Sequence, residues 1–378
     1  MHTLIQRSLF TLALLWANLS LAEVTPPPNL AVNAYILSDF SSGAILANYK
    51  ASERVEPASL TKIMTAYLVF DALQQRHLKL DQRPPISEKA WKAEGSRMFI
   101  EPNNPATVDE LLHGLIIQSG NDAAITLAES VAGTEEQFAA LMNKRALKLG
   151  MKNTHFMNAT GLPDPQHYTT AYDLAILASA LIRDFPLEYK NLYSSKEYTY
   201  NKITQPNRNR LLWLDANVDG MKTGHTEAAG YCLISSSKRS DTRLIAVVLG
   251  AVSETSRAVE SQKLLNYGFQ FFETTVVYRK GQPINAMRVW KGADKAVNAT
   301  VANDVVFSLP KGDYARVKAS MTSQQPLIAP IKAQQVVGKI TFSLDGKVIA
   351  THNLVAAKAV ESGGFFSRML DSVKLMLQ

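Results

Sequence analysis

The sequence contains one cysteine, Cys232, so no disulfide can form within the chain. Its fold must therefore be held by an apolar core, and apolar residues make up 46% of the 378 residues, enough to build one. Cys232 lies in the apolar run Tyr231–Ile234, which favours a buried structural thiol over a reactive one. A chain of this length suits about two domains of ordinary size.

Clusters of positive charge are also lacking. Lys and Arg number 40 against 33 Asp and Glu, a net charge of +7, yet no run of basic residues exceeds two. Nucleic-acid-binding proteins usually concentrate their basic residues, so this dispersed excess argues against that class. It suits a protein of an anionic cell envelope better.

The apolar stretch near the amino terminus, residues 9–21, is shorter than the about 20 residues that cross a bilayer. Arg7 precedes it, and Ser20-Leu21-Ala22 places small residues where a signal peptidase reads them. We therefore predict a secretory signal over residues 1–22, cleaved after Ala22. Cleavage would remove Arg7 and no acidic residue, lowering the net charge to +6. An uncleaved anchor helix is the alternative.

In the rest of the sequence, the pattern that predicts secondary structure changes near residue 274. Residues 23–273 mix helical and strand patterns, which predicts a sheet covered by helices. Residues 274–360 contain short Val-rich runs separated by Pro, Gly and Asp and no convincing helix, so we predict a small all-β domain. This part has one histidine, His352, and no clustered acids, so we expect no chemistry there.

The last segment, residues 361–378, has an amphipathic pattern after Gly363-Gly364. Only 14 residues follow Gly364, about 21 Å of helix, which is too short to span a bilayer. We predict a helix in the membrane interface, with packing on its own domain as the alternative. Its apolar face would carry Phe365, Phe366, Met369, Leu370, Val373, Met376 and Leu377.

Local signals predict several elements of the first domain. Two alternating runs, Ala31–Leu37 and Ala44–Tyr49, indicate a β-hairpin. Capping-box patterns at Thr107 and Thr134 mark two helix starts. Further helices are expected at about residues 59–73, 170–183 and 254–271, and strands at 197–203, 219–223, 231–235 and 243–252.

Three short motifs follow one another: Ser59-Leu-Thr-Lys62, Ser119-Gly-Asn121 and Lys222-Thr-Gly224. Ser-x-x-Lys alone is unspecific, since it recurs at Ser235 and Ser308. Only Ser59 begins a predicted helix and is followed by the other two motifs, each of which occurs once. The ordered set is typical of β-lactamases and penicillin-binding proteins.

The first motif pairs a hydroxyl with an amine. Ser59 and Lys62 are one helical turn apart, so their side chains share a face. A serine hydroxyl needs a base in contact, and Lys62 can be that base only when neutral. Its pKa of about 10.4 would have to fall by roughly three units, which costs about 4 kcal/mol. Burial and a second cation, for which Lys222 is the candidate, can lower the pKa that far.

The other motif residues suit supporting roles. Ser119 can relay a proton between the lysines and the leaving nitrogen, and Asn121 can hold a substrate amide and orient the base. Residues 222–224 are expected at a strand end, where an extended peptide could pair with the strand and the glycine would allow close approach. The backbone N–H groups of Ser59 and His225 could form an oxyanion hole.

On these motifs the chain resembles the low-molecular-mass penicillin-binding proteins, the D-alanyl-D-alanine carboxypeptidases similar to penicillin-binding protein five. The resemblance covers the signal, both domains and the terminal helix. The middle Gly120 matches this family, whereas class A β-lactamases usually have Asp there. Further matching segments are Pro57–Met64, Gln118–Ala123, Asn153–Phe156, Gly161-Leu162 and Asp219–Thr226.

The resemblance implies an α/β penicilloyl-serine-transferase-like (β-lactamase/transpeptidase-like) domain that needs no cofactor or metal. It implies that the enzyme removes the terminal D-alanine from peptidoglycan stem peptides and binds β-lactams covalently, at the periplasmic face of the inner membrane. Arg257 would help to place the substrate carboxylate, with Arg208 a weaker candidate. The implied catalytic residues are Ser59, Lys62, Ser119, Asn121 and Lys222, and the substrate-binding residues are Thr223, Gly224, His225 and Arg257.

Three alternatives stay open. A D,D-endopeptidase would use the same residues, and a weak β-lactamase would share the acylation step, although no acid lies around His155 to speed hydrolysis. A non-catalytic envelope scaffold would not need the intact motifs. One departure from the family is a shorter segment between Leu80 and Met98, which flanks the active site in that family.

Overall fold

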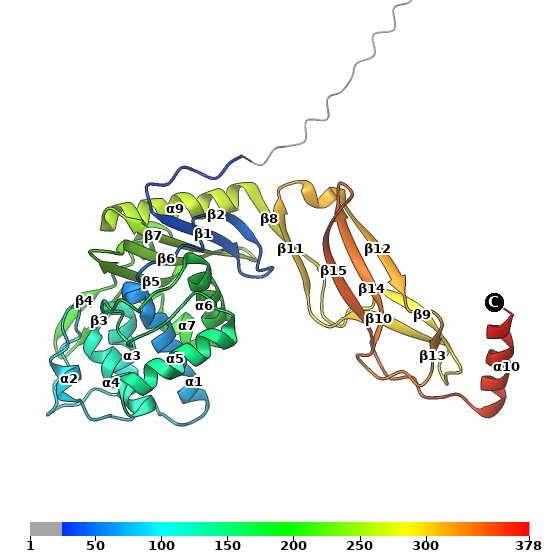
Figure 1. Cartoon of the computed structure of the whole chain (residues 1–378), viewed down its shortest axis with the longest axis horizontal. Helices are drawn as coiled ribbons and strands as arrows, with labels where there is room; N and C mark the ends of the chain where they lie inside the picture. The colour runs from blue at the N-terminus through cyan, green and yellow to red at the C-terminus, as the bar shows by residue number, and fades with distance from the viewer. Residues whose placement is uncertain (1–24, 378) are drawn as a thin grey trace, which may run out of the picture.

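The computed structural model describes residues 25–377. The predicted signal, residues 1–22, lies outside these residues. A mixed α/β domain and an all-β domain stand side by side, and a terminal helix lies at the far end of the second (Figure 1). This is the predicted fold class.

The α/β domain is built on a five-stranded antiparallel sheet with strand order β2-β1-β7-β6-β5. The predicted hairpin forms its β1–β2 edge, and β5, which carries the third motif, forms the opposite edge. The strands are β1 (Ala34–Asp39), β2 (Ile45–Tyr49), β5 (Val218–Thr226), β6 (Gly230–Arg239) and β7 (Thr242–Ala251).

Helices cover both faces of this sheet. Helix α9 packs on one face and α6 on the other, where most of the remaining helices gather. Helix α1 is buried along most of its length, as its nearly continuous apolar sequence requires, and lies within the helical layer (Figure 1). The helices are α1 (Lys62–Gln74), α2 (Glu88–Trp91), α3 (Val108–His113), α4 (Asn121–Ala132), α5 (Glu135–Leu149), α6 (Ala171–Asp184), α7 (Pro186–Leu192), α8 (Leu211–Leu214) and α9 (Glu254–Phe271).

Side-chain caps fix where the longer helices begin. Thr107 and Glu110 form the predicted capping box of α3, and Thr134 caps α5 by accepting the Gln137 N–H. Thr170 and Ser253 cap α6 and α9 in the same way. The predicted helix starts at these positions are confirmed.

Two predicted elements differ in detail. The strand expected at 197–203 is a small hairpin, β3 (Glu197–Tyr200) and β4 (Ile203–Pro206), because Asn201 and Lys202 adopt positive φ angles and turn the chain. The helix expected from residue 59 begins as a 3₁₀ turn, Ala58–Thr61, before α1.

The second domain is all-β apart from a 3₁₀ turn, Asp313–Arg316. A six-stranded sheet with order β12-β14-β15-β10-β9-β13 and a two-stranded ribbon, β8 and β11, enclose a separate apolar core. Its strands are β8 (Phe272–Tyr278), β9 (Asn285–Trp290), β10 (Ala296–Val301), β11 (Val305–Pro310), β12 (Val317–Ser323), β13 (Leu327–Ile328), β14 (Val336–Leu344) and β15 (Lys347–Ala356).

A polar cluster joins the two domains. The buried Asp39 carboxylate at the β1–β2 turn accepts hydrogen bonds from the Ser42 N–H and hydroxyl and from the Thr274 hydroxyl of β8. The Ser308 hydroxyl of β11 lies 3.0 Å from Ser42 Oγ and 2.7 Å from Thr274 Oγ1. The cluster fixes the β8–β11 ribbon against the central sheet.

Helix α10 (Phe365–Met376) contacts the all-β domain through its polar side. The Asp371 carboxylate accepts the Lys291 N–H at 2.7 Å, and Lys295 Nζ reaches both Asp371 and Ser367. The seven predicted apolar-face residues are all exposed. Within residues 25–377, no helix is both long and apolar enough to cross a bilayer.

Candidate active site

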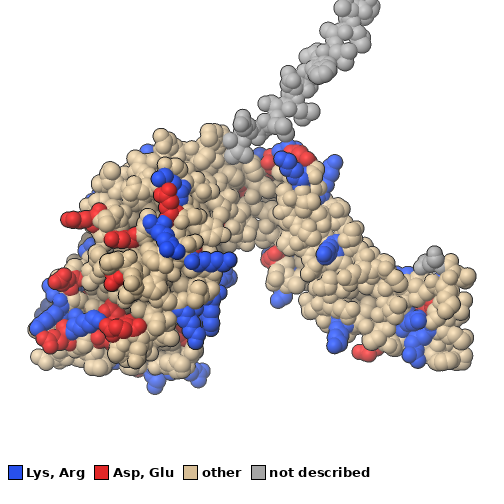
Figure 2. All heavy atoms as spheres, viewed as in Figure 1, with Lys and Arg blue, Asp and Glu red and all other residues tan. Residues whose placement is uncertain are grey.

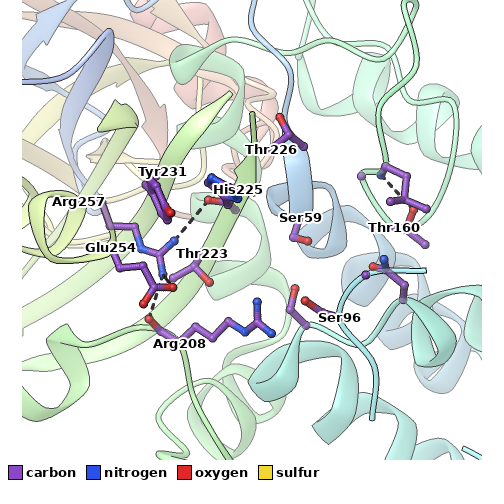
Figure 3. A pocket seen from close by; sticks show the side chains of 16 residues that line it. Ser59, Ser96, Thr160, Arg208, Thr223, His225, Thr226, Tyr231, Glu254 and Arg257 are labelled. Atoms are coloured by element: carbon purple, nitrogen blue, oxygen red, sulfur yellow. Dashed lines mark hydrogen bonds and ion pairs between the residues drawn. The ribbon is translucent and has the colours of Figure 1, made fainter. Parts of the chain in front are cut away.

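The three motifs meet at a cleft of about 420 Å³ between the β5 edge and the helical layer. Figure 3 shows Ser59 at this cleft, with Thr223 and His225 on one side and Ser96 and Thr160 on the other. Its lining contains most of the predicted site residues, namely Ser59, Ser119, Asn121, Thr223, Gly224, His225 and Arg257. Lys62 and Lys222 lie behind this lining and are buried.

The base candidate Lys62 occupies the first position of α1, one turn after the nucleophile candidate. Its Nζ lies 3.0 Å from Ser59 Oγ and donates to Asn121 Oδ1 and to the Thr160 carbonyl, each at 2.6 Å. Burial, followed by the charge of Arg208, lowers the pKa of Lys62 to about 7. This is close to the fall of three units that the sequence argument required.

One charge behind that fall was not expected. Arg208, which we considered only as a weaker candidate for the substrate carboxylate, is a cation that lowers the pKa of Lys62. Lys222 is itself fully buried, and burial together with Lys62, Arg208 and Arg257 holds its own pKa well below its usual range. The two buried lysines therefore lower each other's pKa, while Arg208 remains charged.

Lys222 also lies in the middle of β5, not at a strand end as predicted. Its Nζ donates to Ser119 Oγ at 2.8 Å and to the Thr223 carbonyl at 3.0 Å. The motif is nevertheless accessible to an extended peptide, because β5 is an edge strand of the sheet. Ser119 is therefore bonded to Lys222 on one side and faces the cleft on the other.

A π-helical turn, Gly114–Gln118, presents the second motif. It ends at Ser119, whose φ of 63° is left-handed, and such turns often occur at functional sites. Asn121 begins α4 and donates its side-chain N–H to the Glu94 carbonyl at 2.6 Å. The next residue, Asp122, is buried and accepts the backbone N–H groups of residues 98–100, which fixes the loop beside the motif.

The turn at residues 158–162 is part of the site but was missed by the sequence argument. The Thr160 carbonyl accepts from Lys62, and Gly161, at φ +83°, lies directly against the backbone of Ala58 and Ser59. Gly161-Leu162 appeared only as a matching segment. The contribution of Thr160 is a backbone atom, which leaves no signature in residue types.

Two arginines differ in their accessibility. Arg257 is buried, and its guanidinium is directed to the carbonyls of Gly224 and Arg208 and to Glu254. The Arg208 side chain is exposed and extends into the cleft (Figure 3). Arg208 is thus the more accessible partner for an anionic group.

The competing serines and the cysteine have structural surroundings. Ser235 is buried in the middle of β6, and Ser308 belongs to the domain-joining cluster. Cys232 is buried as predicted, and burial raises the pKa of its thiol to about 11. On the face shown in Figure 2, acidic and basic side chains mix over the α/β domain, in keeping with the dispersed charge of the sequence.

A serine hydroxyl beside a buried lysine of lowered pKa, in a cleft along a sheet edge, suits an enzyme that forms an acyl-enzyme with a peptide-like substrate. No group of His, Cys, Asp or Glu side chains within residues 25–377 is arranged to hold a metal ion. The serine, the lysine hydrogen-bonded to it and the cleft along the sheet edge define the class as that of the serine acyl-transferring peptidases.

Comparisons with known proteins agree. Residues 21–253 match the model of the D-alanyl-D-alanine carboxypeptidase family, and residues 272–362 match that of the penicillin-binding protein 5 C-terminal domain. The chain is 46% identical to the D-alanyl-D-alanine carboxypeptidase DacC of Escherichia coli, over 93% of this chain and 90% of that protein.

Solved structures show the same likeness. The crystal structure of penicillin-binding protein 5 from Haemophilus influenzae has a TM-score of 0.85 at 43% identity and covers 89% of this chain and 100% of that one. Penicillin-binding protein D2 of Listeria monocytogenes, solved with cefotaxime bound, has a TM-score of 0.60 at 32% identity, over 65% of this chain and 100% of that one.

The chain belongs to the D-alanyl-D-alanine carboxypeptidase family and is a serine peptidase of the penicillin-binding protein 5 type. The predicted family, fold class and enzymatic activity are confirmed.

Proposed function

We propose that Ser59 is the nucleophile and that neutral Lys62 is the general base for attack on the penultimate D-alanine of a peptidoglycan stem peptide. Ser59 Oγ bonds to the carbonyl carbon as its proton passes to Lys62 Nζ, and the bond to the terminal D-alanine nitrogen breaks. Ser119, hydrogen-bonded to Lys222, donates its hydroxyl proton to that nitrogen and is reprotonated by the lysine pair, which gives up the proton that Lys62 took from Ser59. Water then hydrolyses the Ser59 ester and completes the carboxypeptidase cycle.

The cleft suggests how a substrate would be held. An extended peptide pairs with the free edge of β5 at Thr223–His225, and the N–H groups of Ser59 and His225 stabilise the oxyanion. The exposed Arg208, with the buried Arg257 behind it, receives the terminal carboxylate. A β-lactam enters the same site and acylates Ser59 by ring opening. A D,D-endopeptidase would use the same groups, so D-alanine release must be compared with cross-link cleavage.

The observation that carries this proposal is the 3.0 Å approach of a buried lysine, whose pKa is about 7, to Ser59 Oγ. Mapping the covalent adduct tests it. After reaction with penicillin, mass spectrometry should find the added mass on the peptide that contains Ser59, and the free enzyme should release D-alanine from a peptide ending in D-Ala-D-Ala. An adduct on Ser119 or Ser235 would contradict the assignment.

We also propose that the mature enzyme begins at Glu23 and acts at the periplasmic face of the cytoplasmic membrane. In this division, residues 23–273 form the catalytic domain, residues 274–360 the β domain, and residues 361–378 the membrane anchor. Support comes from α10, whose polar side is held by the β domain while its apolar face is exposed. An apolar face of this kind binds in the membrane interface.

Deleting residues 365–378 should release the enzyme from lipid vesicles and leave its activity on small peptides unchanged, because α10 lies beyond the all-β domain, far from β5 and α4, which carry residues of the cleft (Figure 1). Phe366→Asp should weaken vesicle binding at least about tenfold, since burying a phenylalanine contributes about 1.5–3 kcal/mol. Met321→Asp on the exposed strand β12 is the matched control and should bind as the natural chain does. Full vesicle retention after the deletion would contradict the anchor.

A further inference from the structure

A carboxylate outside the three motifs reaches the turn that underlies the base. Glu135 is the first residue of α5, and its side chain is only 7% exposed. One carboxylate oxygen accepts the Ala159 N–H at 2.9 Å. The other lies 2.9 Å from Nζ of Lys89, a half-exposed residue of the short helix α2. Glu135 does not line the cleft, so its influence must pass through the turn or through its charge.

The turn transmits this contact to the base. The Ala159 peptide is held on both sides, because its carbonyl accepts the Thr65 hydroxyl of α1 at 2.7 Å while its N–H is bonded to Glu135. The next carbonyl, that of Thr160, is the acceptor 2.6 Å from Lys62 Nζ. The Asn158 side chain also holds this turn, because it accepts the Thr160 and Gly161 N–H groups, so loss of the Glu135 contact would loosen the turn without releasing it.

Four charged or titratable groups other than Ser59 face Lys62 from the surrounding elements. Arg208 lowers the pKa of Lys62, and Lys222 lies behind Ser119, whereas Asp122 and Glu135 both raise the pKa. The Asp122 carboxylate is bonded to backbone N–H groups. Within residues 25–377, Glu135 forms one ion pair, with Lys89 at the surface, and Lys89 binds Glu136 at the same time.

We propose that Glu135, restrained by Lys89, is a positioning residue for the general base. It helps to hold the Thr160 carbonyl beneath Lys62 Nζ and supplies negative charge that favours protonated Lys62, which narrows the pH range in which the base is neutral. This inference rests on the proposed function, because it takes Lys62 as the base.

Acylation by a fluorescent penicillin, followed against pH, tests the pair. Glu135→Gln keeps an oxygen for the Ala159 N–H and removes the negative charge, so protonated Lys62 becomes less stable. The acylation rate falls at acid pH as Lys62 takes up a proton, and we expect this fall, the acid limb of the profile, to move to lower pH by roughly half a unit or more. Lys89→Met leaves the Glu135 charge unopposed and should move the limb to higher pH. In the double variant the limb should follow Glu135→Gln, because Lys89 acts only through Glu135.

Glu136→Gln is the matched control. Glu136 lies on the same helix and binds the same lysine, but its side chain is 75% exposed, and among residues 25–377 it has no hydrogen bond to residues 158–162. The acylation rate of Glu136→Gln should depend on pH as that of the natural enzyme does. If Glu135→Gln does not fold, Lys89→Met against Glu136→Gln decides the question, because Lys89→Met leaves Glu135 in place.

Two failures can be told apart. Acid limbs that stay in place in both Glu135→Gln and Lys89→Met, with only a lower melting temperature, would show a structural pair and overturn the inference. Normal acylation by Lys62→Ala would instead overturn the base assignment on which the inference rests.

Discussion

Replacing Lys62 with alanine should slow acylation of Ser59 by at least about 10³-fold, because Lys62 is the one titratable group within residues 25–377 that is hydrogen-bonded to Ser59 Oγ. The nearest alternative, Lys222, is bonded to Ser119 and not to Ser59. Both penicillin labelling and D-alanine release should fall together, since both begin with the same attack. Stopped-flow acylation at pH 8 gives the measurement.

The Lys62→Arg variant distinguishes a role of Lys62 as general base from a role as a positive charge. Arginine keeps a cation and its donors near Asn121 and the Thr160 carbonyl but cannot lose its proton at this pH. We expect Lys62→Arg to be as slow as Lys62→Ala. Near-natural acylation by the arginine variant would mean that Lys62 acts as a cation, and the search for the base would move to Lys222.

Gly161→Ala should damage the site from the turn beneath it. A Cβ at Gly161 would lie 1.8 Å from the Ala58 carbonyl oxygen and 3.0 Å from the Ser59 nitrogen, both backbone atoms that cannot rotate aside. The nucleophile turn must therefore shift, and a displacement of about 1 Å costs about 10²-fold in rate. Overpacking and the left-handed φ together should lower the free energy of unfolding by about 2–5 kcal/mol.

Gly150→Ala is the control for the backbone angle alone. Gly150 ends α5 at φ +88°, close to the +83° of Gly161, but has no atom within 4 Å of an added Cβ. This variant should lose about 1–2 kcal/mol of unfolding free energy and keep its acylation rate. Equal acylation by both alanine variants would show that the contact of Gly161 with the nucleophile turn does not matter.

The sequence determined those features that depend on neighbouring residues. Ser59 and Lys62 share a face because they are one turn apart, and Thr107 and Thr134 begin helices through bonds to residues three positions on. The amphipathic terminal helix follows from periodicity alone. The order of the three motifs was specific enough to indicate the family.

Tertiary structure alone decided which distant groups surround the base. Thr160 contributes a carbonyl that any residue carries, and Glu135 lies in a helix whose sequence shows only a cap. Lys222 was expected to act on the base, and the fold adds the charge of Arg208, whose place beside Lys62 no motif indicated. A pKa depends on burial and on charges a few ångströms away, and neither follows from spacing along the chain.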